Sequence, residues 1–237
     1  MHPDLARALE LADLAASLAL PRFRAPDLRV ETKPDLTPVT ETDRAVERAL
    51  REALDGEAVL GEEEGGPGPG GRRWIVDPID GTKNYSRGIQ AWFTLIALEV
   101  DGEVEVGVAA APALGRRWWA VRGEGAFADG EPIRVSRVAR LEEAAVSTTH
   151  AVRDVAERAW HRQQFSDAWA HVLVAEGSLD AAVDPVLRPW DIAALKVIVE
   201  EAGGRATDLG GVPGVERGSL VSSNGLFHDE LLRLLER

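Results

Sequence analysis

An apolar segment that runs directly into two carboxylates constrains this chain more than any other feature. The pattern of residues 74–76 predicts a buried strand, and residues 77–82 continue it as DPIDGT. A charge at the end of a buried strand is costly unless a partner compensates it, so Asp77 needs a counter-charge. The proline that follows is expected to stop the strand and bend the chain. Such a bend would aim Asp77, Asp80 and the carbonyl of Ile79 at one point.

Backbone donors follow these oxygen atoms directly. Gly81 and Thr82 are expected to begin a helix, where free N–H groups bind anions such as phosphate. Cation ligands beside anion donors are what metal-assisted phosphoryl transfer requires. The same residues also fit an ordinary turn, because Asp, Pro and Gly all favour turns.

Three further acidic segments point to the same chemistry. Residues 62–64 are three glutamates at the end of a short apolar strand, residues 40–43 read TETD before a predicted helix, and Asp191 opens another helix. Each has a simpler interpretation, namely a solvated loop for the glutamates and helix caps for the other two. Four such segments in this order are poorly explained by chance.

The composition selects the cation and argues against several classes of protein. The chain has no Cys, 5 His and 40 Asp and Glu, so oxygen ligands predominate and Mg²⁺ or Mn²⁺ is favoured. The net charge of −13 argues against binding to nucleic acid, which needs a basic surface. The sequence has neither the long apolar run of a membrane span nor a basic amphipathic helix, so no membrane partner is expected. Charges interrupt the apolar N-terminal stretch, which favours an amphipathic helix over a secretion signal. A cytoplasmic location is therefore expected.

Hydrophobic periodicity and turn signals predict alternating groups of helices and strands. Helices are expected at residues 4–20, 42–54, 152–164, 166–176, 192–202 and 228–235. Strands are expected at residues 59–60, 74–76, 93–100, 103–111, 144–149, 179–183, 205–208 and 220–222, with two short ones within 116–135. This order predicts an α/β (α+β) protein built as a layered α-β-α-β-α sandwich.

The chain resembles the inositol monophosphatase family over nearly its whole length. The first family signature, DP-(I/L)-DGT, lies within WIVDPIDGTKNY at residues 74–85, and the second lies within PWDIAALKVIVEEAGG at residues 189–204. GEE at 61–63 and TETD at 40–43 fall where the family has supporting carboxylates, and SSNG at 222–225 extends the match. The resemblance implies the inositol-monophosphatase/fructose-1,6-bisphosphatase-like fold and Mg²⁺-dependent hydrolysis of a small phosphate monoester.

Metal ligands follow from the resemblance. It implies that Glu62, Asp77 and the Ile79 carbonyl hold a first Mg²⁺, with Mn²⁺ as a possible substitute. Asp77, Asp80 and Asp191 would hold a second ion, and a looser third ion would depend on Glu62. One cation would activate a water molecule and another would stabilise the leaving oxygen, in an in-line attack with no phosphoenzyme.

A second group of residues is implied in handling the water and the phosphate. Thr82, hydrogen-bonded to Asp43, would help Glu62 to orient and deprotonate the water, and it would bind the phosphate together with Gly81. Lys33, one of only three lysines, resembles a family lysine near this water. It fits a surface residue equally well.

The second half of the chain is expected to select the substrate. The family carries an acidic residue seven positions before the aspartate of the WD motif, here Asp184, and a further contact just before LVAEG, here Asp167. Together with Asp191 these residues would contact the substrate, and two carboxylates suit a cationic amine better than a polyol. KPDLTPVTETDRAVE, APALGRRWWAVRGEGAF and LVAEGSLD most closely resemble the family's histidinol-phosphate phosphatases, so the expected reaction converts L-histidinol phosphate to L-histidinol in histidine biosynthesis.

Other activities remain open at this point. Inositol-1-phosphate is the next candidate substrate, followed by a nucleotide 3′-phosphate or fructose 1,6-bisphosphate. A degenerate member could instead be an inactive metal-binding interaction module. Such a protein should have lost one of the implied site residues, and none is lost here: Glu62, Asp77, Asp80, Thr82 and Asp191.

The resemblance also implies an organisation and a partner. Residues 1–140 would form an α+β half with most metal ligands, and residues 141–237 an α/β half with Asp191 and the substrate-side residues, in one compact unit. A homodimer is expected. The segment at 150–165 is short for the family and Ser166 replaces a usual glycine, so the dimer contact and the substrate are less constrained than the chemistry.

Overall fold

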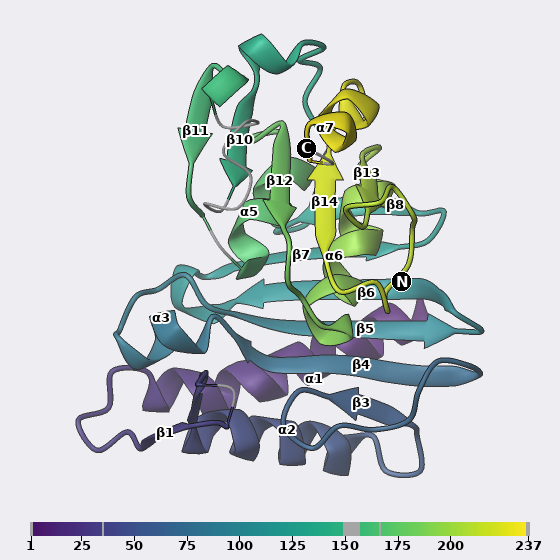
Figure 1. The fold of residues 1–237 in the computed structure, drawn as a ribbon. Helices are drawn as coiled ribbons and strands as arrows, with labels where there is room; N and C mark the ends of the chain where they lie inside the picture. Colours follow the sequence, from purple (N-terminus) through teal and green to yellow (C-terminus); the bar gives the residue numbers. More distant parts are fainter. Residues whose placement is uncertain (1, 35, 149–156, 166, 236–237) are drawn as a thin grey trace.

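The chain folds into alternating layers of helices and sheets (Figure 1). The computed structural model describes residues 2–34, 36–148, 157–165 and 167–235. From one outer face to the other, the layers are α1 (Pro3–Ala19) with α2 (Glu41–Ala53), a seven-stranded sheet, α5 (Asp167–Ala175) with α6 (Pro189–Glu201), a five-stranded sheet, and α7 (His228–Leu235). The α-β-α-β-α sandwich predicted from the sequence is therefore confirmed.

The seven-stranded sheet follows the order of the chain. Its strands, in sheet order, are β3 (Val59–Gly61), β4 (Arg72–Asp80), β5 (Phe93–Val100), β6 (Glu103–Ala111), β7 (Arg116–Val121), β8 (Gly125–Ala128) and β9 (Glu131–Pro132). All neighbours are antiparallel except β3 and β4. Asp101 and Gly102 join β5 to β6 with φ angles of 50° and 89°, which are the positive values that a two-residue hairpin turn requires.

Helices cover both faces of this sheet. In β5, Leu95 and Ala97 pack with residues of α6, whereas Ile96 and Leu98 pack with residues of α1 and α2. Successive residues of a strand point to opposite faces, so a strand buried on both faces needs a largely apolar sequence without alternation. Gly107 in β6 allows α6 to lie very close, because a Cβ there would be 2.7 Å from a backbone oxygen of that helix.

The five-stranded sheet is mixed and belongs to the second half of the chain. In sheet order its strands are β11 (His161–Gln163), β10 (Ala145–Thr148), β12 (Ala181–Asp184), β14 (Leu220–Ser223) and β13 (Arg205–Thr207). Val146, Val183 and Val221 pack in one cluster with Leu231 of α7. All strands of the seven-stranded sheet precede residue 140 in the sequence, and all strands of the five-stranded sheet follow it. However, α6 comes from the second half of the chain and packs against the first sheet. The division of the chain into two halves at residue 140 therefore stays a prediction.

The structure corrects two local predictions. The helix predicted at 152–164 is wrong at its C-terminal end, where His161–Gln163 form the edge strand β11 parallel to β10; residues 152–156 of that prediction lie outside the described residues. Pro78 does not end its strand, because β4 continues to Asp80 through an irregularity in its pairing with β5. Proline is tolerated at such a bulge because no ladder hydrogen bond is lost.

Some short elements were not predicted. They are the two-stranded sheet of β1 (Val30–Thr32) and β2 (Pro38–Thr40), a third strand within residues 116–135 where two were predicted, and the 3₁₀ turns η1 (Leu20–Arg22), η2 (Pro112–Leu114) and η3 (Leu141–Glu143). The helix α3 (Thr82–Ser86) begins at the helix start that the sequence predicted. Within the described part of the chain, none of the helices has the length and apolar character needed to span a membrane.

Candidate active site

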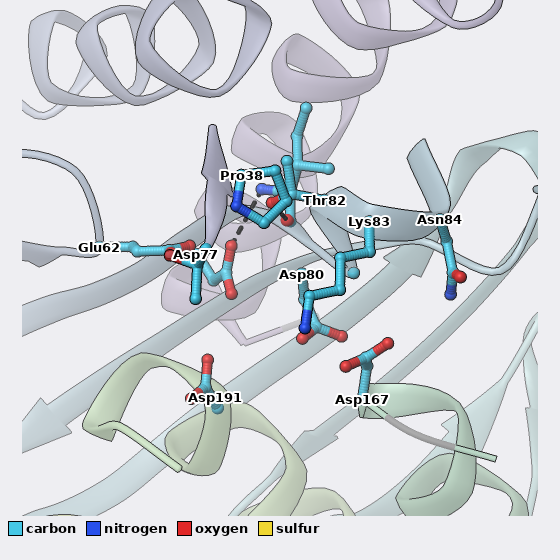
Figure 2. Close-up of a pocket in the computed structure, with 12 residues that line it drawn as sticks. Pro38, Glu62, Asp77, Asp80, Thr82, Lys83, Asn84, Asp167 and Asp191 are labelled. Carbon is cyan, nitrogen blue, oxygen red and sulfur yellow. Dashed lines mark hydrogen bonds between the residues drawn. The ribbon is translucent and has the colours of Figure 1, made fainter. Parts of the chain in front are cut away.

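A pocket of about 330 Å³ lies where β4 ends and helices α3, α5 and α6 begin (Figure 2). This is the lower end of the size range for small-molecule sites. Eight residues singled out in the sequence line it, namely Glu62, Asp77, Ile79, Asp80, Gly81, Thr82, Asp167 and Asp191. Thr37, Pro38, Lys83 and Asn84 complete the lining.

The irregularity in β4 explains how two aspartates of one strand reach the same pocket. In a regular strand, residues three positions apart point to opposite faces. Here the register with β5 shifts between Asp77 and Asp80, and the Ile79 N–H donates to Asp77 Oδ1 at 3.0 Å. The Thr94 hydroxyl donates to the Pro78 carbonyl at 2.9 Å and holds the bend from the neighbouring strand. Both carboxylates therefore face the pocket.

Asp191 joins them from the first turn of α6. Its Oδ2 accepts the Arg188 N–H at 2.7 Å, which is a helix cap. One oxygen each of Asp77, Asp80 and Asp191 lie within 4.8 Å of one another. Asp191 is therefore a helix cap whose carboxylate also lines the pocket, and its role as a metal ligand stays a prediction.

The first turn of α5 also lines the pocket, through Asp167. The Ala168 N–H donates to Asp80 Oδ2 at 2.8 Å, and Asp167 has a left-handed φ of 59°. A Cβ at Gly81 would lie 3.4 Å from Asp167 Oδ2, and Gly81 itself has a φ of 80°. Gly81 therefore adopts a positive φ that most other residues avoid, and its missing side chain leaves space beside the Asp167 carboxylate.

Asp43 lies beneath the pocket and holds Thr82. Asp43 is fully buried, and burial raises the pKa of its carboxyl even though Thr40 and Thr82 donate hydrogen bonds to it. The Thr82 hydroxyl is 3.1 Å from Asp43 Oδ1 and 3.0 Å from the Ile79 carbonyl. Asp43 also completes a capping box with Thr40 at the start of α2. The hydrogen bond between Thr82 and Asp43 expected from the sequence is present.

Comparison with known proteins identifies the family. The model of the inositol monophosphatase family matches residues 1–237. The chain belongs to the inositol monophosphatase family. It is 49% identical to a protein of Mycobacterium tuberculosis named histidinol-phosphatase, covering 99% of this chain and 98% of the relative. A Streptomyces coelicolor protein of the same name is 44% identical, with coverages of 99% and 97%. A solved structure described as an IMPase of Thermotoga maritima superposes with a TM-score of 0.89 at 35% identity, over 98% of this chain and 96% of that one.

Members of this family use divalent metals, and the carboxylate cluster fits such an ion. Asp77 and Asp80 are only 1% and 8% exposed. Burial and the neighbouring carboxylates raise the pKa of both well above the usual range, and burial raises the pKa of Asp191 to about 7. Like charges held together away from water need a cation, and an all-oxygen donor set suits a hard divalent one.

Lys33 lies outside the pocket lining. Its Nζ donates to Glu62 Oε1 at 2.8 Å and to Glu63 Oε1 at 2.7 Å. Burial lowers the pKa of the Lys33 amine, but these two hydrogen bonds outweigh it and the pKa is raised. Lys33 therefore orients the Glu62 side chain in this structure, and its predicted place near the water stays a prediction.

Asp184 also lies outside the pocket lining. It is 8% exposed, and its Oδ2 is 3.0 Å from Nε2 of the buried His171, whose Nδ1 is 2.8 Å from the Ser222 hydroxyl. This carboxylate oxygen is committed to a protein partner, so of the two carboxylates predicted to select the substrate only Asp167 lines the pocket. The contact of Asp184 with substrate stays a prediction.

Sequence reasoning missed the residue that supports the loop directly after Glu62. Glu47 of α2 is fully buried and accepts the N–H groups of Glu63 at 2.7 Å and Glu64 at 3.1 Å, while Arg51 pairs with it at 2.7 Å. A Cβ at Gly61 would be 2.2 Å from a Glu47 oxygen, so the glycine makes room for this carboxylate. A glutamate on the apolar face of an amphipathic helix was the available signal.

These buried carboxyls predict an unusual stability profile for the metal-free protein. The pKa of Asp191 is raised to about 7 in the folded state, so the folded protein binds more protons than the unfolded chain, and stability is lost as pH rises through that value. We expect the melting temperature measured in EDTA to rise as pH falls from about 8 to 6.5. Below pH 6.5 the opposite effect of His228 begins, because burial lowers the pKa of His228 to about 4 and favours its neutral form.

A saturating divalent cation is the control for this profile. Bound metal stabilises the ionised carboxylates, so the rise in melting temperature toward pH 6.5 should disappear or reverse. A metal-free protein that melts at the same temperature across this range would contradict the raised pKa values of these carboxyls.

Proposed function

We propose that this chain is a Mg²⁺-dependent histidinol-phosphate phosphatase, which hydrolyses L-histidinol phosphate to L-histidinol. The family assignment makes the chain a phosphoric monoester hydrolase that acts on a small phosphate ester. The proposal for the substrate rests on one observation of the site: a carboxylate, Asp167, lines the pocket beside the metal-ligand cluster. It is supported by the near full-length similarity to two proteins named histidinol-phosphatase.

We assign the metal-binding role to the oxygen atoms at the base of the pocket. Asp77, Asp80, Asp191, Glu62 and the Ile79 carbonyl would hold two or three Mg²⁺ ions, with Mn²⁺ as a weaker substitute. Bound Mg²⁺ would supply Lewis-acid polarisation of the phosphate and a lower pKa for a water molecule.

The remaining pocket residues would bind the phosphate and orient the attacking water molecule. The N–H groups of Gly81 and Thr82, at the start of α3, would donate to a phosphate oxygen. When the Thr82 hydroxyl donates to Asp43, its lone pairs stay available to a water molecule. Glu62, held by Lys33, lines the same pocket and would accept the proton of that water.

Asp167 distinguishes the candidate substrates. Histidinol phosphate carries an ammonium group and an imidazole at the end opposite its phosphate, whereas inositol-1-phosphate offers hydroxyl groups there. A carboxylate accepts a charge-assisted hydrogen bond from an ammonium group, which is worth about 1.5–3 kcal/mol and therefore one to two decades in specificity. Inositol-1-phosphate remains the second candidate because the solved structure reported above is described as an IMPase.

We expect the wild type to hydrolyse L-histidinol phosphate with a higher kcat/KM than inositol-1-phosphate. Asp167→Asn should lower kcat/KM for histidinol phosphate about tenfold more than for inositol-1-phosphate, since the amide loses the negative charge. Asn also tolerates the left-handed backbone of this position, so the loop should keep its shape. The measurement is the ratio of the two kcat/KM values at saturating Mg²⁺, in which any common effect on the metal cancels.

Asp184→Asn is the comparison variant. Because its carboxylate contacts His171, we expect a lower melting temperature and a smaller change in the substrate ratio than for Asp167→Asn. A wild type that prefers inositol-1-phosphate would overturn the histidinol assignment and leave the phosphatase chemistry intact. The homodimer and the cytoplasmic location expected from the sequence stay predictions.

A further inference from the structure

Lys83 is the only cationic side chain among the described residues that line the active-site pocket. Five carboxylates share this lining: Glu62, Asp77, Asp80, Asp167 and Asp191. Lys33 does not line the pocket, and its amine already binds two glutamates. The chain contains only three lysines and carries a net charge of −13, so a cation at this position stands out against its surroundings.

The charge of the loaded pocket shows what such a cation would do. Two divalent cations would leave the five carboxylates with one uncompensated negative charge. A phosphate monoester dianion would then approach a pocket that is still negative, on a protein that is strongly negative overall. One additional fixed positive charge makes the loaded pocket neutral and favours the approach of an anion.

The position of Lys83 suits contact with the phosphate. It follows Thr82 directly on α3, and Figure 2 shows its side chain extending toward the side of the pocket where the Asp80 and Asp167 carboxylates lie. Lys83 is exposed, and within the described residues no ion pair engages it. Its amine is therefore free to donate to a ligand.

Arg87 continues the same charged edge one helical turn later. Lys83 and Arg87 line a second hollow of about 570 Å³ next to the pocket, together with Val30, Pro38 and Ser86. Pro38 and Lys83 belong to both linings, so the hollow adjoins the pocket. In the described part of the chain Arg87, like Lys83, has no carboxylate partner. The two cations form a path along which an anion can reach the metal site.

We propose that Lys83 is a substrate-binding residue that donates a hydrogen bond to the phosphate group, and that Arg87 attracts the incoming anion toward it. This inference rests on the proposed phosphatase function, because it assigns the phosphate end of the substrate. It does not depend on which alcohol the phosphate esterifies. Lys83 and Asp167 would then bind opposite charges of one substrate.

Binding of inorganic phosphate tests Lys83 without turnover. Titration calorimetry at saturating Mg²⁺ should give a dissociation constant about tenfold higher for Lys83→Gln than for the wild type, as expected for loss of one charge-assisted hydrogen bond. Lys83→Arg keeps the charge and should restore most of the affinity. Arg233→Gln, which removes an exposed charge on α7 away from the pocket, is the matched control and should bind phosphate like the wild type.

Steady-state kinetics test whether Lys83 and Arg87 attract the anionic substrate. Lys83→Gln should raise KM more than it changes kcat. The dependence of log kcat/KM on ionic strength should be shallower for Lys83→Gln and Arg87→Gln than for the wild type, because fewer fixed charges attract the substrate. A residue that only stabilised the fold would not change this slope.

Two outcomes separate the claims. If Lys83→Gln binds phosphate as tightly as the wild type but binds Mg²⁺ more tightly, Lys83 merely offsets the carboxylates and the inference is overturned. If the wild type binds phosphate tenfold better than Lys83→Gln yet hydrolyses no monoester, Lys83 is supported and the proposed reaction fails.

Discussion

Removal of divalent cations is expected to abolish hydrolysis, and Mg²⁺ is expected to restore it. Asp77, Asp80 and Asp191 place three carboxylate oxygens within 4.8 Å of one another, and all three side chains have raised pKa values. Without a cation this pocket repels a phosphate and offers no electrophile, so we expect a rate loss of at least about a thousandfold. The assay is hydrolysis of L-histidinol phosphate after dialysis against EDTA, followed by titration with Mg²⁺ or Mn²⁺.

The control is the folded state of the metal-free protein. The elements around the pocket have their own hydrogen bonds, including the capping box of α2 and the cap at the start of α6. Metal-free protein should therefore keep its far-UV circular dichroism and lose activity only. Mn²⁺ should restore less activity than Mg²⁺. Full turnover in excess EDTA would refute the metal assignment, and unfolding in EDTA would show that the metal also has a structural role.

The fold could be predicted where the sequence carries local signals. The predicted bounds of β5, β6 and α7 agree with the structure because two largely apolar runs meet at an Asp-Gly turn and the last helix is amphipathic. β11 could not be predicted in this way. Its three polar or charged residues form a strand only because β10, a distant segment until the chain folds, offers a free edge.

Eight residues of the pocket lining could be predicted from the sequence, but their geometry could not. DPIDGT indicated which side chains belong together, but the sequence suggested that Pro78 ends the strand. In the structure the strand continues, and a bulge turns Asp80 to the side of Asp77. The spacing in the sequence cannot distinguish these cases, because both give two aspartates near one point.

Hydrogen bonds between residues that are far apart in the sequence also could not be predicted. Glu47 beneath Glu63 and His171 beside Asp184 are both buried, and nothing in their immediate sequence indicates the hydrogen bonds that they make. Buried polar groups have partners as a rule, but the sequence alone does not say which. Asp184 was predicted to contact substrate, and only the structure reveals its protein partner.

Asp191→Asn is expected to lower kcat at least about a hundredfold while the protein stays folded. The side chain has two separable functions. Oδ2 accepts the Arg188 N–H at 2.7 Å and caps α6, and an asparagine oxygen can do the same. The negative charge near Asp77 and Asp80, which would stabilise a cation, is lost in the amide. Steady-state kinetics and a thermal melt of the same preparation measure the two functions separately.

Two matched variants make this test specific. Asp191→Ala removes the cap as well, so it should lose the same activity and also melt at a lower temperature. Asp180→Asn makes the same chemical change at another buried aspartate, which accepts the Ala145 N–H at 2.6 Å and lies outside the pocket. It should lower the melting temperature without a comparable loss of kcat. Near-normal turnover of Asp191→Asn would mean that Asp191 is only a helix cap, and the metal site would then have to be built from Glu62, Asp77, Asp80 and the Ile79 carbonyl.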